Sequence, residues 1–296
     1  MNAWEPAFLL RESDAGAGEA LAPFTVSRPA GQAGPLVFAS PHSGRVYPEP
    51  MMTATRLDAE AIRRSEDAWV DRLIDGAPRF GVSVIAARLA RVFLDVNREP
   101  WELDPAMFSD ELPAYARGRS ARVAAGLGAI ARIVSEGEEV YARKLTFAEA
   151  RQRVEAAHAP YHEALRALVA DSVERSGVAI LVDWHSMPSA AARQGGCDIV
   201  LGDRFGGACA AEVSRAVEQG FEAMGYRVAR NSPYAGGYTT EHYGRPARGV
   251  HALQIELDRA LYMDEASLQP STGFNVLRAD LERLFARLAD ADWSGL

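Results

Sequence analysis

Seven short apolar runs, rich in β-branched residues and mostly separated by helical stretches, constrain the fold of this chain more than any other feature of its sequence. A run that is apolar at nearly every position is typical of a strand buried on both faces of a largely parallel sheet. The runs are LVFAS at 36–40, VSVIAAR at 82–88, VFLDV at 92–96, VAILVDW at 178–184, CDIVLGD at 197–203, YRVAR at 226–230 and HALQIEL at 251–257. They predict an α/β fold with three layers, α/β/α, in which helices cover both faces of a mostly parallel, mixed sheet.

Four stretches between the runs carry apolar residues at three- and four-residue spacing with charged opposite faces, which predicts helices that pack on the sheet. They lie at 58–75, roughly 147–175, 206–223 and 275–290. A chain of 296 residues without internal repeats fits one large α/β domain. We therefore predict a single catalytic domain at 35–296 after an irregular leader at 1–34, in which Phe24 and Val26 are suited to an edge strand.

Charge and cysteine content exclude several classes of protein. Acidic residues number 40 against 32 lysines and arginines, and the net charge of −8 repels a phosphate backbone, so we expect no nucleic-acid partner. Cys197 and Cys209 lie in no CxxC motif and no Cys/His cluster, which argues against disulfides or a structural zinc module. The N-terminus lacks a signal-peptide pattern, and no apolar stretch approaches membrane-spanning length. We expect a cytoplasmic protein without a membrane partner.

Two histidines follow strand runs at the edge where open α/β sheets bind ligands, outside the carboxyl ends of the strands. His42 follows LVFAS in the segment PHSG, and His185 follows VAILV in the segment DWHS. Neutral imidazoles suit zinc, and a catalytic zinc site has three protein ligands with the fourth position left to water. We predict that both histidines bind Zn²⁺ or another divalent metal. The alternative for each is a neutral side chain hydrogen-bonded to the backbone.

The third metal ligand is expected from the acidic segment SEDAWVD at 65–71, near the start of a predicted helix. Asp67 is the preferred ligand, and Glu66 and Asp71 are the alternatives. A solvated position on a helix is the ordinary role of such carboxylates, so each also has a non-functional interpretation. Asp183 precedes His185 by two positions and either orients that imidazole or ends its strand.

Glu256 ends the apolar run HALQIE, so its carboxylate is expected to be partly desolvated at the same edge of the sheet. A desolvated carboxylate with a raised pKa is suited to act as a general base toward metal-activated water. The alternative is a structural ion pair with Arg259. His242 is a second catalytic candidate that would assist an oxyanion, and its alternative is an exposed position in a loop.

Asn97 and Arg98 follow the run VFLDV, where a guanidinium can hold a carboxylate through two parallel hydrogen bonds and the amide can add another. A surface salt bridge with Glu99 is the alternative for Arg98. Arg45 and Arg91 are further cations near this edge. An acidic chain that gathers arginines at a candidate site is suited to a small anionic substrate.

The loop NSPYAGGYTT at 231–240 is a further candidate for substrate binding through Gly236, Gly237 and Tyr238. Paired glycines there permit a substrate to approach the backbone closely, or merely form a tight turn.

His158 and His162 are four residues apart, but Pro160 separates them and the order is not His-Glu-x-x-His. We expect His162 to pack or to face the substrate, and we expect no second zinc site here.

Seven segments resemble, in one order, motifs of the N-formylglutamate amidohydrolases. They are PHSG at 41–44, DAWVDRL at 67–73, FLDVNREP at 93–100, DWHSMP at 183–188, DIVLGD at 198–203, SPYAGGY at 232–238 and QIELDRALYMDE at 254–265. The resemblance implies hydrolysis of N-formyl-L-glutamate to formate and glutamate, the last step of one route of histidine degradation. Paralogues of such enzymes would act on other N-acyl amino acids.

That family looks like a branch of the zinc carboxypeptidase-like hydrolases, so the resemblance also implies their fold. In those enzymes a His ligand, an acidic ligand, an Asn-Arg pair that binds substrate, a second His ligand and a catalytic Glu follow one another. The same order is reproduced here by His42, Asp67, Asn97 with Arg98, His185 and Glu256. One departure is that carboxypeptidases place the acidic ligand three residues after the first His, where this chain has Arg45.

Together these features predict a metal-dependent amidohydrolase whose substrate is a small anionic N-acyl amino acid. In the expected mechanism the metal lowers the pKa of a water molecule, Glu256 accepts its proton and returns it to the leaving amine, and Arg98 holds a substrate carboxylate. One alternative is a small zinc carboxypeptidase or a deacylase for longer N-acyl amino acids. An alternative of another class is a non-catalytic protein that binds a metal or an amino acid. The oligomeric state stays open.

Overall fold

The computed structural model describes residues 22–116, 118, 120–134 and 137–296. The chain forms two compact units, each assembled from separate stretches of sequence. Among the described residues, unit 1 consists of 22–25, His42–Glu66 and Ala87–Glu163, and unit 2 consists of Val26–Pro41, Asp67–Ala86 and Ala164–Leu296. The division into a leader at 1–34 and one domain at 35–296 stays a prediction, and residues 1–21 of that leader lie outside the described residues.

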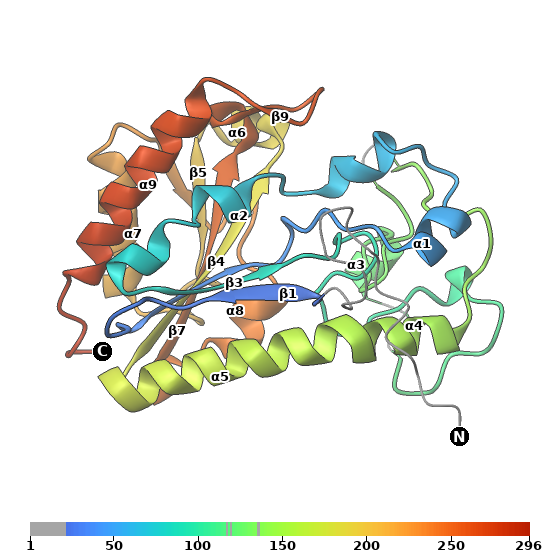
Figure 1. Cartoon of the computed structure of the whole chain (residues 1–296), viewed down its shortest axis with the longest axis horizontal. Helices are drawn as coiled ribbons and strands as arrows, with labels where there is room; N and C mark the ends of the chain where they lie inside the picture. Colours follow the sequence, from blue (N-terminus) through green and yellow to red (C-terminus); the bar gives the residue numbers. More distant parts are fainter. Residues whose placement is uncertain (1–21, 117, 119, 135–136) are drawn as a thin grey trace. The chain divides into compact units, whose positions relative to one another are not determined.

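A seven-stranded sheet has the strand order β1-β3-β2-β4-β7-β5-β6 (Figure 1). The strands are β1 (Phe24–Ser27), β2 (Leu36–Ser40), β3 (Ser83–Ala87), β4 (Ala179–Met187), β5 (Ile199–Gly202), β6 (Val228–Arg230) and β7 (Val250–Asp258), and β8 (Met263–Asp264) pairs separately with β9 (Gln269–Pro270). Strand β2 is parallel to β3 and β4, β4 to β7, and β5 to β6, whereas β5 and β7 are antiparallel. The predicted mostly parallel, mixed sheet is therefore confirmed, and so is the predicted edge strand, because β1 is outermost.

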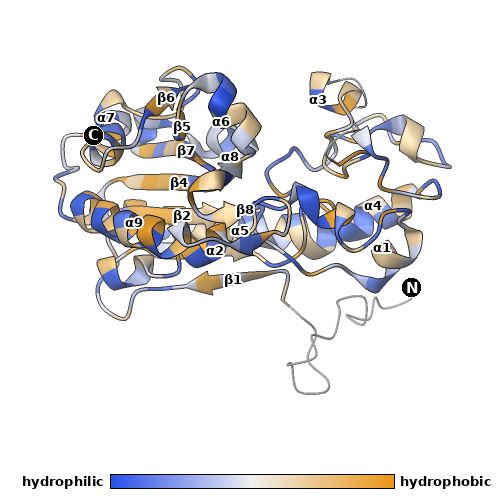
Figure 2. Ribbon diagram, turned by 90° about the horizontal axis from the view of Figure 1, so that it is seen from above, coloured by the Kyte–Doolittle hydropathy of each residue, from blue (hydrophilic) through white to orange (hydrophobic). Residues whose placement is uncertain are grey.

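Unit 2 supplies helices for both faces of this sheet. They are α2 (Val70–Leu73), α5 (Ala159–Ser176) from Ala164 onward, α6 (Ser189–Gly195), α7 (Ala211–Glu222), α8 (Tyr238–Tyr243) and α9 (Gly273–Ala289), with 3₁₀ helices at Ala77–Phe80, Pro246–Arg248 and Arg259–Leu261. Helices α9 and α5 lie on opposite sides of the sheet (Figure 1), as a three-layer fold requires. Figure 2 colours β2 and β4 largely as hydrophobic, which agrees with burial on both faces. Among the helices of the described residues, none is both long and apolar enough to cross a membrane.

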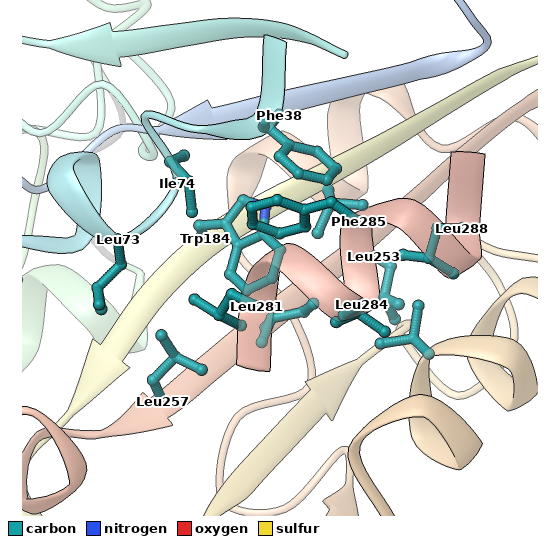
Figure 3. Close-up of a cluster of buried hydrophobic side chains, with 14 of the residues drawn as sticks. Phe38, Leu73, Ile74, Trp184, Leu253, Leu257, Leu281, Leu284, Phe285 and Leu288 are labelled. Carbon is teal, nitrogen blue, oxygen red and sulfur yellow. The ribbon is translucent and has the colours of Figure 1, made fainter. Parts of the chain in front are cut away.

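Aromatic packing fixes the core of unit 2 (Figure 3). Phe38 of β2, Trp184 of β4 and Phe285 of α9 form a triangle of edge-to-face contacts, with ring centroids 5.3, 5.0 and 5.7 Å apart. Each such pair contributes about 0.5–1.5 kcal/mol beyond the burial of its apolar area. Leu281 of α9 and Leu253 of β7 belong to the same cluster. This packing anchors α9 to the middle of the sheet.

Unit 1 contains shorter elements around its own core. They are α1 (Glu49–Ala54), α3 (Ala121–Ala124), α4 (Phe147–Arg153), the first turn of α5, a π-helical turn at Val154–His158 and 3₁₀ helices at Ala61–Ser65 and Pro105–Met107. The helix predicted at 147–175 is confirmed as α4, the π turn and α5 in succession, and α7 and α9 confirm two others. The helix predicted at 58–75 is wrong as one element, because Glu66 is extended and Trp69 has a left-handed backbone with φ of 68°. Asp67 therefore lies between helices.

The run VFLDV at 92–96 is not a strand, contrary to prediction. Its backbone turns, because the N–H groups of Phe93 and Leu94 donate to the carbonyl oxygen of Ala90. Val92, Phe93 and Leu94 are buried in the core of unit 1, where the guanidinium of Arg153 lies 4.6 Å from the centre of the Phe93 ring. Burial in a turn produces the same apolar pattern as burial in a strand.

Candidate active site

His42, Asp67 and His185 form a buried group that can hold a metal ion. One potential ligand atom of each lies within 4.8 Å of the others, and the side chains belong to residues that are 3%, 2% and 2% exposed. His42 is two residues beyond the end of β2, so the covalent chain keeps it at the carboxyl end of that strand, as expected. His185 lies on β4, which pairs with β2 in parallel. Two imidazoles and a carboxylate are a donor set that suits zinc.

The two alternative acidic ligands have other contacts. Tyr47 donates its hydroxyl hydrogen to Oε1 of Glu66 at 2.5 Å, and Arg63 donates to both carboxylate oxygens of Glu66 at 3.0 and 3.2 Å. Asp71 lies on α2, with an oxygen 3.7 Å from the guanidinium of Arg72. Of the three predicted acids, Asp67 is the one that the structure groups with the histidines.

The imidazole of His185 lies between two carboxylates. Strand β4 continues to Met187, so His185 lies within the strand, contrary to the prediction that it follows the strand end. Trp184 points into the core (Figure 3), so Asp183 and His185 face the other side of the sheet. Nδ1 of His185 is 3.0 Å from Oδ2 of Asp67, and Nε2 is 3.0 Å from Oδ2 of Asp183. Burial disfavours the protonated imidazole, but these carboxylates outweigh it and raise the pKa of His185 well above its ordinary value.

Arg259 holds the other oxygen of Asp67. Its guanidinium donates to Oδ1 of Asp67 at 3.1 Å and, through Nε, to the hydroxyl oxygen of Ser186 at 3.3 Å. Arg259 immediately follows β7 and is 7% exposed. A charge-assisted bond of this kind favours the ionised carboxylate and restricts its orientation.

Asp95 is a functional candidate that the sequence patterns did not reveal. It is 4% exposed, and its carboxylate accepts from Nε2–H of His42 at 2.6 Å, from Arg91 at 2.9 Å and from the backbone N–H of Asn97 at 2.8 Å. Burial favours the neutral acid, but the charges of His42, Arg98 and Arg91 outweigh it and hold the pKa of Asp95 well below its ordinary value. The sequence signal that could have indicated Asp95 was its position as a single carboxylate inside the apolar run VFLDV.

Asn97 lies in a turn and Arg98 in the bend after it, whereas the prediction placed both at the end of a strand. Asn97 is 1% exposed, and the guanidinium of Arg98 donates to the carbonyl oxygens of Asn97 at 2.9 Å and Leu127 at 3.2 Å. Burial lowers the pKa of Arg98, while the nearby Asp95 opposes this change. Backbone carbonyls therefore orient this cation in unit 1, and its role in substrate binding stays a prediction.

His158 and His162 support the backbone of the same segment. Nε2–H of His158 donates to the carbonyl oxygen of Arg98 at 2.9 Å, and Nε2–H of His162 donates to that of Val96 at 2.7 Å. Their ring centroids are 4.3 Å apart. These contacts are those of packing residues, which is one of the two roles expected for His162.

Glu256 lies within β7, beside His185 of β4 in the parallel register. The strand continues to Asp258, so the carboxylate is not at the strand end that the sequence predicted. The residue is 7% exposed, and Oε1 accepts a hydrogen bond from Nε2 of Gln254 at 2.8 Å. The role of Glu256 as general base stays a prediction.

The loop candidates occupy the segment before and within α8. Gly236 has φ of +123°, Gly237 precedes the helix, and Tyr238 and His242 lie on it. His242 is exposed, stacks on Tyr238 with ring centroids 4.9 Å apart, and belongs to a helix rather than a loop.

Arg45 is partly buried three residues after His42. The catalytic and substrate-binding roles of these residues stay predictions.

Known proteins resemble this chain over most of its length. Residues 34–263 match the N-formylglutamate amidohydrolase family. The N-formylglutamate deformylase of Pseudomonas putida is 30% identical over 248 residues, covering 78% of this chain and 82% of the relative, and that of Pseudomonas aeruginosa PAO1 is 30% identical over 237 residues, covering 78% and 83%. The crystal structure of N-formylglutamate amidohydrolase from Ralstonia eutropha JMP134 has a TM-score of 0.88 and 37% identity, covering 93% of this chain and 100% of that one. These matches show that the chain belongs to the N-formylglutamate amidohydrolase family.

Proposed function

We propose that this protein is a metal-dependent amidohydrolase that cleaves N-formyl-L-glutamate to formate and L-glutamate. Its relatives from two Pseudomonas species are named N-formylglutamate deformylases, and each covers 78% of the chain. The single observation that carries the metal dependence is the buried group of His42, Asp67 and His185. A place in histidine degradation and a cytoplasmic location stay predictions.

The residues around these three donors fit a divalent cation. Each imidazole has a carboxylate partner, Asp95 at 2.6 Å for His42 and Asp183 at 3.0 Å for His185, which is how ligating histidines are usually oriented. His42, Asp67 and His185 would hold the metal. When bound, such a metal polarises the carbonyl of the substrate and lowers the pKa of a water molecule.

Glu256 moves the proton of the reaction in this proposal. Hydrolysis adds the oxygen of one water molecule to the formyl carbon, and the C–N bond breaks as the nitrogen gains a proton. Glu256 accepts a proton from the attacking water and donates it to the leaving amine, so its carboxylate is regenerated in each turnover. Its burial within β7 and its hydrogen bond from Gln254 support this role.

Asn97 and Arg98 bind the substrate carboxylate in this proposal. A guanidinium presents two parallel N–H donors to a carboxylate, which fixes the direction of the bound molecule. Asp95 supports this arrangement, because it accepts from the backbone N–H of Asn97 and pairs with Arg91. The substrate is therefore expected to need a free carboxylate.

A formate-release screen with zinc-reconstituted protein tests the substrate. We expect N-formyl-L-glutamate to be hydrolysed faster than other N-formyl amino acids, than N-acetyl-L-glutamate and than peptides with a free C-terminus. Faster turnover of a longer N-acyl amino acid or of a peptide would favour the deacylase or carboxypeptidase alternative. Stoichiometric zinc without turnover of any of them would favour a binding protein.

A matched set of histidine variants tests the metal site. His42→Ala and His185→Ala should each abolish zinc retention and turnover, because each removes one of three ligands. His251→Ala is the control, since His251 is a buried histidine of β7 that accepts a hydrogen bond from the backbone N–H of Ala210. It should keep its zinc, and retention of zinc by all three variants would place the metal elsewhere.

A further inference from the structure

Gln254 lies in the row of side chains that carries the candidate active site. Gln254 and Glu256 are two positions apart on β7, so they point to the same face of the sheet. Parallel pairing places Gln254 beside Asp183 and Glu256 beside His185 on β4. On the other side, antiparallel pairing places Gln254 beside Gly202 of β5. Gln254 is 5% exposed, so its amide is a buried polar group that needs partners.

Both ends of the Gln254 amide make hydrogen bonds. Oε1 accepts from the backbone N–H of Gly237 at 2.7 Å, and Nε2 donates to Oε1 of Glu256 at 2.8 Å. A backbone N–H only donates and an ionised carboxylate only accepts, so the amide can have one orientation. Glutamine satisfies both partners, whereas an ionised glutamate at this position would have no hydrogen to donate to Glu256.

Two glycines allow the loop backbone to reach Gln254. A Cβ on Gly202 would lie 2.7 Å from the carbonyl carbon of Ala235, so the loop rests directly on the end of β5. Gly236 has φ of +123°, a conformation that side chains rarely permit, and a Cβ there would clash with Oγ1 of Thr240. The hydroxyl of Thr240 donates to the carbonyl oxygen of Gly237 at 2.8 Å and braces the start of α8.

We propose that Gln254 is a positioning residue that orients the carboxylate of Glu256 and couples it, through Gly237, to the start of α8. This inference rests on the proposed role of Glu256 in proton transfer. The bond from Nε2 restricts rotation of the carboxylate about its last torsion and so directs the accepting oxygen. Because Oε1 is held by the backbone of Gly237, a shift of that loop turns the Gln254 amide and with it the carboxylate.

A double-mutant cycle on kcat tests the link between the two side chains. Gln254→Met keeps the volume of the side chain and removes both hydrogen bonds. We expect it to lower kcat for N-formyl-L-glutamate about 10- to 100-fold, the cost of a misplaced catalytic group, with a much smaller change in KM. In the Glu256→Gln background the same substitution should cause almost no further loss of kcat, because no catalytic carboxylate is left to position.

Losses that multiply in the double variant, or a near-normal kcat for Gln254→Met, would overturn the proposal. His251→Ala is again the control, because it alters a buried hydrogen bond elsewhere on β7. Its kcat should stay close to that of the wild type, and zinc content should be equal in all variants. If Gln254→Met lowered kcat only by weakening the fold, the loss would appear in both the wild-type and the Glu256→Gln backgrounds. The cycle therefore distinguishes weaker folding from a loss of positioning.

Hydrogen exchange separates this inference from the choice of substrate, because it needs no turnover. In Gln254→Met the amide of Gly237 loses its acceptor, so we expect exchange in the peptide containing it to be at least about tenfold faster than in the wild type and in His251→Ala. Unchanged exchange there would contradict the proposal. If the wild type releases no formate but Gln254→Met still exchanges faster at Gly237, the hydrogen bonds from Gly237 through Gln254 to Glu256 are supported and the substrate assignment is wrong.

Discussion

Replacing Asp95 by asparagine tests the link between the candidate ligand His42 and the cations of unit 1. The substitution keeps the size of the side chain but removes the charge that accepts from His42 at 2.6 Å and from Arg91 at 2.9 Å. These two bonds use different oxygens of the carboxylate. An asparagine amide has one acceptor atom, so its NH₂ group must face one of the two donors.

The expected loss of zinc affinity follows from these contacts. Loss of the carboxylate partner of a ligating histidine ordinarily weakens metal binding about 10- to 100-fold, or about 1.4–2.8 kcal/mol. We therefore expect the dissociation constant for zinc to rise by that factor at neutral pH. Folding should weaken by about 1–3 kcal/mol, because buried donors lose a charged acceptor.

Competition with a chromophoric zinc chelator measures the affinity, and thermal melts followed by circular dichroism confirm the fold. Glu139→Gln is the matched control in the same unit. Its carboxylate lies 3.2 Å from Arg56, and both side chains are 50% exposed, so loss of this surface pair should leave zinc affinity unchanged. If folded Asp95→Asn binds zinc as tightly as the wild type, the reasoning from the His42 contact is refuted.

Three further substitutions have defined outcomes. Glu256→Gln should lower kcat for formate release about 10²- to 10⁴-fold at unchanged zinc content, because it keeps the shape and removes the proton acceptor; near-normal turnover would exclude it as the base. Arg98→Lys should raise KM for N-formyl-L-glutamate about tenfold or more in steady-state kinetics, since an ammonium cannot form two parallel bonds, and an unchanged KM would exclude Arg98 from carboxylate binding. The hydrogen bond from Arg143, together with those from Thr146, outweighs the effect of burial and lowers the pKa of Glu149 from 4.5 to about 2. The ionised Glu149 therefore stabilises the fold above pH 4.5, and this contribution is lost as the pH falls through about 2. Glu149→Gln should therefore lower the free energy of unfolding by about 1 kcal/mol at neutral pH and by less at lower pH. If denaturation curves show the same loss of free energy at every pH, this assignment is contradicted.

The strands were largely predictable because burial on both faces leaves a continuous apolar pattern. LVFAS coincides with β2, and five of the other six runs overlap β3, β4, β5, β6 and β7. Strand ends were less predictable, because His185 and Glu256 are polar yet lie inside β4 and β7, where they alternate with core residues such as Trp184. VFLDV was misassigned because Val92, Phe93 and Leu94 are buried in the core of unit 1 without forming a strand.

The candidate metal ligands were predictable from the sequence, whereas the contacts that support them were not. His42 and His185 stand out because histidines that follow apolar strand runs are expected at the ligand-binding edge of the sheet. Asp95 and Gln254 stand out only when the chain is folded, since Asp95 contacts a histidine 53 residues away and Gln254 contacts a backbone N–H 17 residues away. No periodicity in the sequence encodes which donor a buried amide or carboxylate will meet.

Zinc titration into chelator-stripped protein, followed by the rate of formate release from N-formyl-L-glutamate, tests the central claim most directly. With two imidazoles and one carboxylate as ligands, the rate should rise in proportion to added zinc and reach a plateau at about one metal ion per chain. Undiminished formate release from the stripped protein, or uptake of one zinc ion per chain without formate release, would contradict the proposal of a metal-dependent N-formylglutamate amidohydrolase.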